Sequence, residues 1–192
     1  AQAKWRQAEL REAALAMSNE EVFFGSALLD GKKGAVSDVI DEVFRIESDS
    51  YPEDEAASHE ALTFRMNHVP QLFLVAFDTQ GVIGYICGTR GVGTTLTEEA
   101  LSSDDPDGKT ALVHSVCVRA DSRRKGLASR LMSLYIEQLK KLALQGELDT
   151  VMLCCKEHLQ PFYQKAGFEL MGPSNFVHGK DPWYDLKLNL TA

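Results

Sequence analysis

Apolar stripes and short apolar runs follow one another along this chain and predict helices and strands in a mixed order. Five apolar residues at helical spacing predict a helix that ends near Ser48, and Ser58 can cap the next helix. Residues 123–144 open with basic residues and predict a long amphipathic helix, and residues 158–165 predict a short one. Residues 1–17, rich in Ala, Glu, Gln and Leu, also predict a helix. The five stripe residues are Val36, Val39, Ile40, Val43 and Phe44.

Apolar runs of strand length, bounded by turn residues, predict the strands. Two of these runs, residues 72–77 and 82–88, are joined by residues 78–81, which end in Gly and predict a hairpin turn. The polar residues 94–109 predict a loop with a short helical piece. The other predicted strands are residues 22–29, 111–118, 150–155, 167–170 and 183–190.

Strands and helices in this mixed order predict an α/β or α+β fold built around one sheet. The chain has 192 residues, which suits one domain with its own core, and it contains no internal repeat, low-complexity tract or linker. We therefore predict a single domain over residues 1–192, with residues 1–20 as an N-terminal helical extension.

Charge and composition argue against several classes of function. The formal net charge of −8 disfavours nonspecific nucleic-acid binding, which needs a basic surface, and favours cationic partners. No apolar run approaches the roughly 20 residues of a membrane span, so we expect no membrane partner. The cysteines lie in apolar contexts without the spacing of a zinc site, which predicts reduced, buried thiols in a cytoplasmic protein and no bound metal. These cysteines are Cys87, Cys117, Cys154 and Cys155.

The feature that indicates most chemistry is a buried strand that runs into a basic, glycine-containing turn and then into a helix. Val113–Val118 is the strand, Arg119–Lys125 carries four basic residues, and Gly126 lets a ligand approach the backbone. Free amide groups and the dipole at a helix start favour an anion such as a pyrophosphate. A solvated basic turn would contain the same residues, and the run lacks the Gly-Lys-Ser/Thr of a P-loop.

The pattern Arg-x-x-Gly-x-Ala at Arg123, Gly126 and Ala128 resembles the acetyl-coenzyme A signature of the GCN5-related N-acetyltransferase superfamily. Pro161–Phe168 resembles a late segment of the same family. The resemblance implies a single-domain acetyltransferase fold with a central mixed, mostly antiparallel sheet flanked by helices. Within the family, three blocks are most similar to the arylalkylamine N-acetyltransferases of non-vertebrates. These blocks are residues 51–58, 114–128 and 155–174.

The resemblance also implies the reaction and its partners. Acetyl would pass from acetyl-coenzyme A directly to the primary amine of a small molecule such as tryptamine, serotonin, tyramine or phenylethylamine, in a ternary complex without a metal. We expect a monomer. The backbone N–H groups of Val116 and Val118 would hold the pantetheine arm of the coenzyme. The implied coenzyme-binding residues are Val116, Cys117, Val118, Arg123, Arg124, Lys125, Gly126, Leu127, Ala128 and Ser129.

Three residues are candidates for proton transfer in such a reaction. A primary ammonium, with a pKa of about 10, must lose a proton before attack, and His114 titrates near neutrality. Glu55 is a second candidate base, because its loop resembles that of the insect dopamine acetyltransferases. Tyr163 is the candidate acid for the departing thiolate, since phenol and thiol differ by only about 1.5 pKa units. Leu112 stands where the vertebrate relatives carry another histidine, so we expect no relay through two histidines.

Acceptor binding is predicted around the acidic loop, where aromatic residues favour an aryl group. The predicted acceptor-binding residues are Tyr51, Pro52, Glu53, Asp54, Cys154 and Phe176. The sequence leaves open a polyamine, diamine or protein N-terminal acetyltransferase, because an acidic loop also suits a dication. A non-catalytic acyl-coenzyme A binding module is the alternative of another class, and the presence of both His114 and Tyr163 argues against it. Cys155 has no histidine beside it in sequence, so we do not expect a cysteine nucleophile.

Overall fold

A mixed sheet forms the centre of the protein. The computed structural model describes residues 16–17, 20–26, 36–93, 102–175 and 179–190. Within these ranges seven strands form one sheet in the order β3-β4-β5-β6-β7-β9-β8, and β1 pairs with β2 separately. Neighbouring strands of the sheet are antiparallel except β6 and β7, so the predicted mostly antiparallel α/β fold is confirmed. The strands are β1 (Ala16–Met17), β2 (Glu20–Glu21), β3 (Phe23–Ser26), β4 (Phe73–Phe77), β5 (Val82–Gly91), β6 (Thr110–Val118), β7 (Thr150–Lys156), β8 (Glu169–Pro173) and β9 (Trp183–Asn189).

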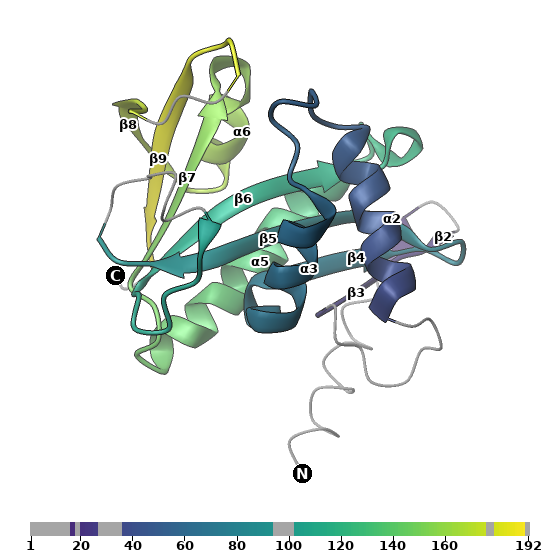
Figure 1. Cartoon of the computed structure of the whole chain (residues 1–192), viewed down its shortest axis with the longest axis horizontal. Coiled ribbons are helices and arrows are strands. Elements are labelled where there is room, and N and C mark those ends of the chain that lie inside the picture. The colour runs from purple at the N-terminus through teal and green to yellow at the C-terminus, as the bar shows by residue number, and fades with distance from the viewer. Residues whose placement is uncertain (1–15, 18–19, 27–35, 94–101, 176–178, 191–192) are drawn as a thin grey trace.

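Helices cover both faces of the sheet. Figure 1 shows α2 (Val36–Ser48) and α3 (His59–His68) on one face, and α5 (Leu127–Leu144) behind the other. The short α6 (Gln160–Lys165) lies beside the C-terminal strands. None of the helices in the described ranges is long and apolar enough to cross a membrane. Single 3-10 turns occur at Pro70–Leu72, Ala120–Ser122 and Glu157–Leu159.

Amphipathic patterns explain how the two faces are packed. The stripe on α2 buries Ile40 and Val43 against one face of the sheet, as its spacing predicts. On the other face, α5 buries Leu131, Tyr135 and Leu139 in a separate core. The predicted cap of α3 is confirmed, because the Ser58 hydroxyl accepts a hydrogen bond from the Ala61 amide at 3.1 Å.

The N-terminal prediction is wrong where it can be compared. Ala16–Met17, expected as the end of a helix, is a strand that pairs with Glu20–Glu21. Residues 1–15 of that prediction lie outside the described residues, as do residues 27–29 of the first predicted strand and 94–101 of the predicted loop. The neighbouring residues 102–109 are mostly irregular, with a bend, a turn and one helical residue at position 102.

The start of the long helix also differs from the prediction. α5 begins at Leu127 rather than at Arg123, because the intervening turn contains two residues with positive φ values. These are Arg124 (φ 64°) and Gly126 (φ 81°). A positive φ is incompatible with a right-handed helix, so the helix can begin only after Gly126.

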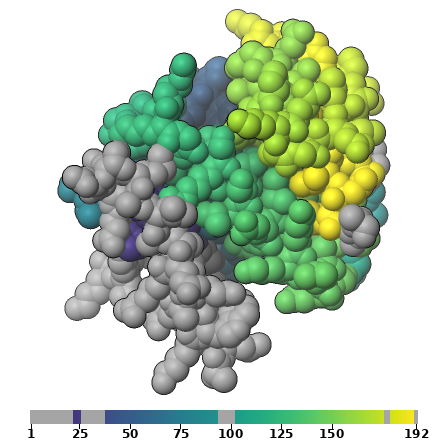
Figure 2. Space-filling view, turned by 180° about the vertical axis from the view of Figure 1, so that it is seen from behind, coloured from purple at the N-terminus to yellow at the C-terminus, as the bar shows by residue number. Residues whose placement is uncertain are grey.

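β6 departs from regular pairing on both of its sides. β6 pairs with β7 only from Thr110 to Leu112, opposite Thr150 to Met152, and beyond these pairs the strands diverge (Figure 1). On its other side, β6 pairs Ser115 with Cys87 but Val113 with Gly88, so His114 is the extra residue of a β-bulge. Figure 2, seen from behind, shows the C-terminal strands standing apart from the β6–α5 part at the upper edge.

Candidate active site

The turn between β6 and α5 presents backbone amides to solvent. The first helical hydrogen bond of α5 is donated by the Arg130 amide to the Gly126 carbonyl at 3.1 Å. The amides of residues 127–129 precede that bond, so they have no intrahelical carbonyl to donate to. A Cβ added at Gly126 would meet nothing within 4 Å, which leaves open space beside the turn. This cradle fits the pyrophosphate of a nucleotide coenzyme.

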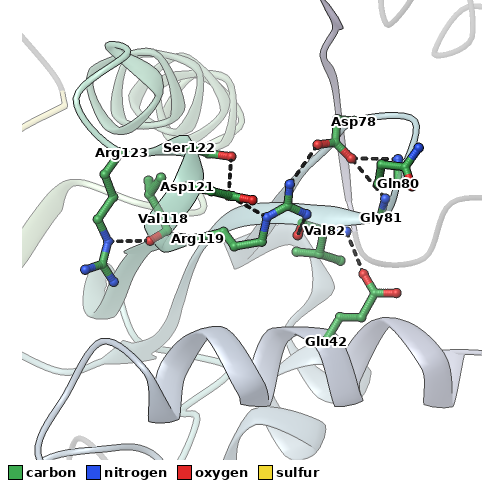
Figure 3. Close-up of polar contacts among 10 residues, drawn as sticks. All are labelled: Glu42, Asp78, Gln80, Gly81, Val82, Val118, Arg119, Asp121, Ser122 and Arg123. Atoms are coloured by element: carbon green, nitrogen blue, oxygen red, sulfur yellow. Dashed lines mark hydrogen bonds and ion pairs between the residues drawn. The ribbon is translucent and has the colours of Figure 1, made fainter.

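The basic residues of the turn divide into those that anchor it and those that remain exposed. Arg119 donates to Asp78 at 3.0 Å and to Asp121 at 2.8 Å, and Figure 3 shows its guanidinium pointing toward the β4–β5 hairpin. Arg123 Nε donates to the Val118 carbonyl at 2.8 Å. Arg119 therefore ties the turn to the hairpin. Arg123 is exposed although it also donates to the Ser50 hydroxyl at 3.0 Å, and Arg124, Lys125 and Ser129 are exposed beside it.

Two predicted coenzyme contacts must be restricted to the backbone. The Leu127 side chain is buried in the α5 core, so only its amide can meet a ligand. The Cys117 side chain points into the α2 face, where its thiol donates to a Glu47 carboxylate oxygen at 3.1 Å. Val116 and Val118 lie beyond the last β6–β7 pair, with their side chains on the α5 side.

A cavity of about 690 Å³ opens where β6 and β7 diverge. Its walls come from α2, the α2–α3 loop (residues 49–58), α3, β5, β6, the end of β7, α6 and the start of β9. The residues from the sequence-based predictions that line it are Tyr51, Pro52, Glu55, His114, Val116, Cys154 and Tyr163. Glu53 and Asp54 are exposed and are not among the lining residues, and Phe176 lies outside the described residues.

His114, the bulge residue, lies in the wall of this cavity. Its Nε2 is 2.8 Å from the Thr89 hydroxyl, which fixes the ring. Burial, and then the positive charge of Arg65, lower the pKa of His114 well below its usual range. Because the shift is downward, the imidazole is neutral at pH 7 and can accept a proton.

Tyr163 comes from α6 and lies 7% exposed beside the same opening. Burial raises the pKa of its phenol well above the usual value, and neighbouring thiols add to the shift. The phenol is therefore protonated and can donate. Tyr51 also lines the cavity, and burial raises its pKa in the same direction.

Glu47, which the sequence analysis missed, is a buried residue in the wall of the cavity. Glu47 is 1% exposed, and its carboxylate accepts hydrogen bonds from the Ala57 amide (2.8 Å) and the Tyr85 hydroxyl (2.6 Å). Ser115 donates at 3.0 Å and Cys117 at 3.1 Å to the same carboxylate. The available signal was position, because Glu47 follows Val43 and Ile40 by four and seven residues on the apolar stripe of α2.

Glu55 lies in the cavity wall as predicted, but it has an internal partner. Its Oε1 is 2.8 Å from Nζ of Lys156, and the two side chains are 6% and 15% exposed. To accept a proton, Glu55 would have to give up a weakly screened ion pair, which weighs against the predicted role as a base.

The cysteines are free thiols, and three of them are buried, as predicted. Burial raises the pKa of Cys154 to about 12 and that of Cys155 to about 11. Both thiols therefore stay protonated at neutral pH, which agrees with the expectation that neither acts as a nucleophile.

The helix-start cradle, the diverging strands and the histidine-lined cavity lie together around the second half of β6. Residues 40–168 match the model of the Acetyltransferase (GNAT) family, and the chain belongs to that family. It is 31% identical to serotonin N-acetyltransferase of Mesocricetus auratus and 28% identical to that of Macaca mulatta, each over 121 residues. Each match covers 63% of this chain. The chain spans only 57% and 58% of the lengths of these relatives.

Solved structures support the fold. The loading GNATL domain of CurA from Lyngbya majuscula superposes with a TM-score of 0.71 at 12% identity, covering 90% of this chain and 98% of that one. Ard1 from Thermoplasma volcanium has a TM-score of 0.64 at 18% identity, over 90% of this chain and 99% of that one. At these identities the likeness extends to the fold alone.

Proposed function

We propose that this protein transfers acetyl from acetyl-coenzyme A to the primary amine of a small arylalkylamine, by direct attack in a ternary complex. The observation that carries the proposal is that His114 and Tyr163 line one cavity at the point where β6 and β7 separate. Family membership and the serotonin N-acetyltransferase relatives support the reaction class. Acetyl-coenzyme A would supply a thioester carbonyl as the electrophile and a thiolate as the leaving group.

The coenzyme fits the open side of the β6–α5 junction. The amides of residues 127–129, with Arg124 and Lys125 beside them, would bind its pyrophosphate. The backbone from Val116 to Val118 lies beyond the last β6–β7 pair and would hold the pantetheine arm as a sheet holds an added strand.

His114 is the group that we assign to accept the acceptor's proton. An ordinary ammonium, with a pKa of about 10, would transfer its proton uphill to an imidazole whose pKa is lowered. Burial of the ammonium in the same cavity lowers its pKa as well, so the two shifts run in the same direction. We assign Glu55 to a cation site instead, because its carboxylate is already paired with Lys156.

Tyr163 is the group that we assign to donate a proton to the departing sulfur. Its raised pKa makes it a weaker acid in isolation. The neighbouring Cys155 indicates that thiols in this cavity are shifted the same way, since burial raises its pKa to about 11. A coenzyme thiolate in this place would therefore take up a proton more readily than it does in water.

Acceptor choice is proposed from the walls of the cavity. Tyr51, Phe64 and Trp183 line it and offer aromatic surface to an aryl group. The acidic residues Glu53 and Asp54, which favour a polyamine in the sequence analysis, face solvent outside the lining.

One assay tests the proposal. Purified protein is incubated with acetyl-coenzyme A and tyramine, tryptamine or spermidine, and both thiol release and the acetylated product are measured. We expect thiol release that depends on an aromatic monoamine and yields the N-acetyl product. Turnover of spermidine alone would favour a polyamine acetyltransferase. Coenzyme binding without turnover of any amine would indicate a non-catalytic module and contradict the proposal.

A further inference from the structure

Lys156 lies in the wall of the acceptor cavity with its ammonium held on three sides. Nζ is 2.8 Å from Oε1 of Glu55 and 3.6 Å from Oδ2 of Asp181. The same nitrogen lies 4.2 Å from the ring centroid of Trp183, over its face. All four residues line the cavity. Two carboxylates and an indole face make a cage that suits an alkylammonium ion.

Separate segments of the chain build this cage and hold it in place. Glu55 belongs to the α2–α3 loop, Lys156 ends β7, and Trp183 begins β9. The side chains of Lys156 and Glu55 are 15% and 6% exposed, so solvent and salt screen the pair weakly. Gly179 lies so close to Glu55 that a Cβ added there would collide with Oε1 of the carboxylate. Glycine at position 179 therefore leaves room for the carboxylate beside Lys156.

This arrangement limits the negative charge that the cavity offers to an acceptor. The carboxylate of Glu55 is matched by Lys156, and that of Glu47 accepts from four donors. Glu53 and Asp54 face solvent. Within the part of the chain that the structure describes, the α2–α3 loop presents the cavity with no carboxylate that lacks a partner.

We propose that Lys156 is a specificity-determining residue that restricts the acceptor to monoamines, an inference that rests on the proposed function. Its ammonium occupies the cation site formed by Glu55, Asp181 and Trp183. An acceptor with a second ammonium, such as a diamine or polyamine, meets a like charge where it needs a carboxylate. An aromatic monoamine has no second charge to place, so the occupied site does not exclude it.

The test is a gain of function. Wild type and Lys156→Ala are compared for kcat/KM with tyramine, a monoamine, and with cadaverine, a diamine. The alanine variant removes the internal ammonium and leaves the cage vacant for the second ammonium of cadaverine. We expect the cadaverine-to-tyramine ratio of kcat/KM to rise by about tenfold or more, since a weakly screened pair of charges easily exceeds that factor.

Matched variants separate charge from a general loosening of the site. Lys156→Arg keeps the charge and should keep the wild-type ratio. Lys156→Gln removes the charge but fills most of the space, so it should raise the ratio by less. The double variant Lys156→Ala with Glu55→Gln should lose the gain, because the carboxylate is gone. An unchanged ratio in whichever of the alanine and glutamine variants folds would overturn the inference, as would a gain that survives Glu55→Gln.

Cadaverine binding, measured by calorimetry, distinguishes this inference from the proposed function. If wild type acetylates no amine, the proposed function fails, while tighter cadaverine binding by Lys156→Ala still supports the cation site. If wild type acetylates tyramine and the variant changes neither the ratio nor cadaverine binding, only the specificity inference fails.

Discussion

The turn before α5 and the α2–α3 loop both border the path that we propose for the reactants, but different groups hold them. The turn is shaped by its backbone, with positive φ values at Arg124 and Gly126 and exposed side chains around them. The loop is fastened by buried carboxylates: Glu47 accepts the Ala57 amide, and Glu55 pairs with Lys156. The proposed coenzyme site thus lies on one stretch of chain, whereas the proposed acceptor wall is assembled from distant residues.

This difference predicts separable effects of substitution. Changes in the turn should weaken coenzyme binding with little loss of stability. Changes to the buried carboxylates should lower stability and leave coenzyme binding intact. Changes to His114 and Tyr163, which lie between the two regions, should lower kcat alone. The four predictions below test this separation, from the largest expected effect to the smallest.

Tyr163→Phe should lower kcat by about 10²–10⁴-fold, because it removes a proton donor and keeps the ring. Steady-state kinetics and coenzyme titration measure the two effects, and coenzyme Kd should hardly change. Tyr135→Phe is the control: its hydroxyl donates to the Leu72 carbonyl in the α5 core, away from the cavity. Full turnover by Tyr163→Phe would show that Tyr163 is not the proton donor and only packs in the core.

His114→Gln should lower kcat/KM by about a hundredfold at neutral pH and recover part of the rate at high pH, where more amine is already deprotonated. Since the pKa of His114 is lowered, the acid limb of the wild-type pH profile should lie below pH 6.5, and the variant should lack it. Glu55→Gln should keep that limb. Loss of the limb in Glu55→Gln would restore the base role predicted from sequence. His68→Gln, at an exposed histidine, is the control substitution.

Glu47→Ala should lower the free energy of unfolding by about 3 kcal/mol, because it leaves several buried donors without their acceptor. Urea denaturation measures the loss. Glu53→Ala, in the exposed part of the same loop region, should change it by less than about 0.5 kcal/mol. The KM for the amine should rise in Glu47→Ala while coenzyme Kd stays constant. A rise in coenzyme Kd would break the separation between the two regions.

Gly126→Glu should raise coenzyme Kd by more than about tenfold, since it adds a side chain and a like charge at the cradle. Gly146→Glu is a matched control beyond the other end of α5: Gly146 also has a positive φ (75°), and a Cβ there would also meet nothing within 4 Å. Both variants carry the same backbone strain, so only the first should affect the coenzyme. Equal coenzyme Kd values in the two variants would show that the turn is not part of the coenzyme site.

Sequence reasoning succeeded where the determinants are local. The apolar stripe of α2, the Ser58 cap and the Gly126 turn are each determined by residues within one or two helical turns of one another, and all three are present. The contacts around the α2–α3 loop could not be predicted from the sequence. Glu47 and Ser115 are 68 positions apart, and Glu55 and Lys156 are 101 positions apart. No periodicity links such pairs, so the sequence could not show that the carboxylate of Glu55 is already paired within the fold.

The extra residue at His114 also changes how β6 distributes its side chains. Before the bulge, the odd-numbered Ala111 and Val113 face the α5 core. After it, the even-numbered Val116 and Val118 face that core, and the odd-numbered Cys117 turns to α2. The bulge thus reverses which residues of the strand, odd-numbered or even-numbered, face the α5 core. If the same residues alternated regularly here, without a bulge, the thiol of Cys117 would point into the α5 core and a valine would face the carboxylate of Glu47.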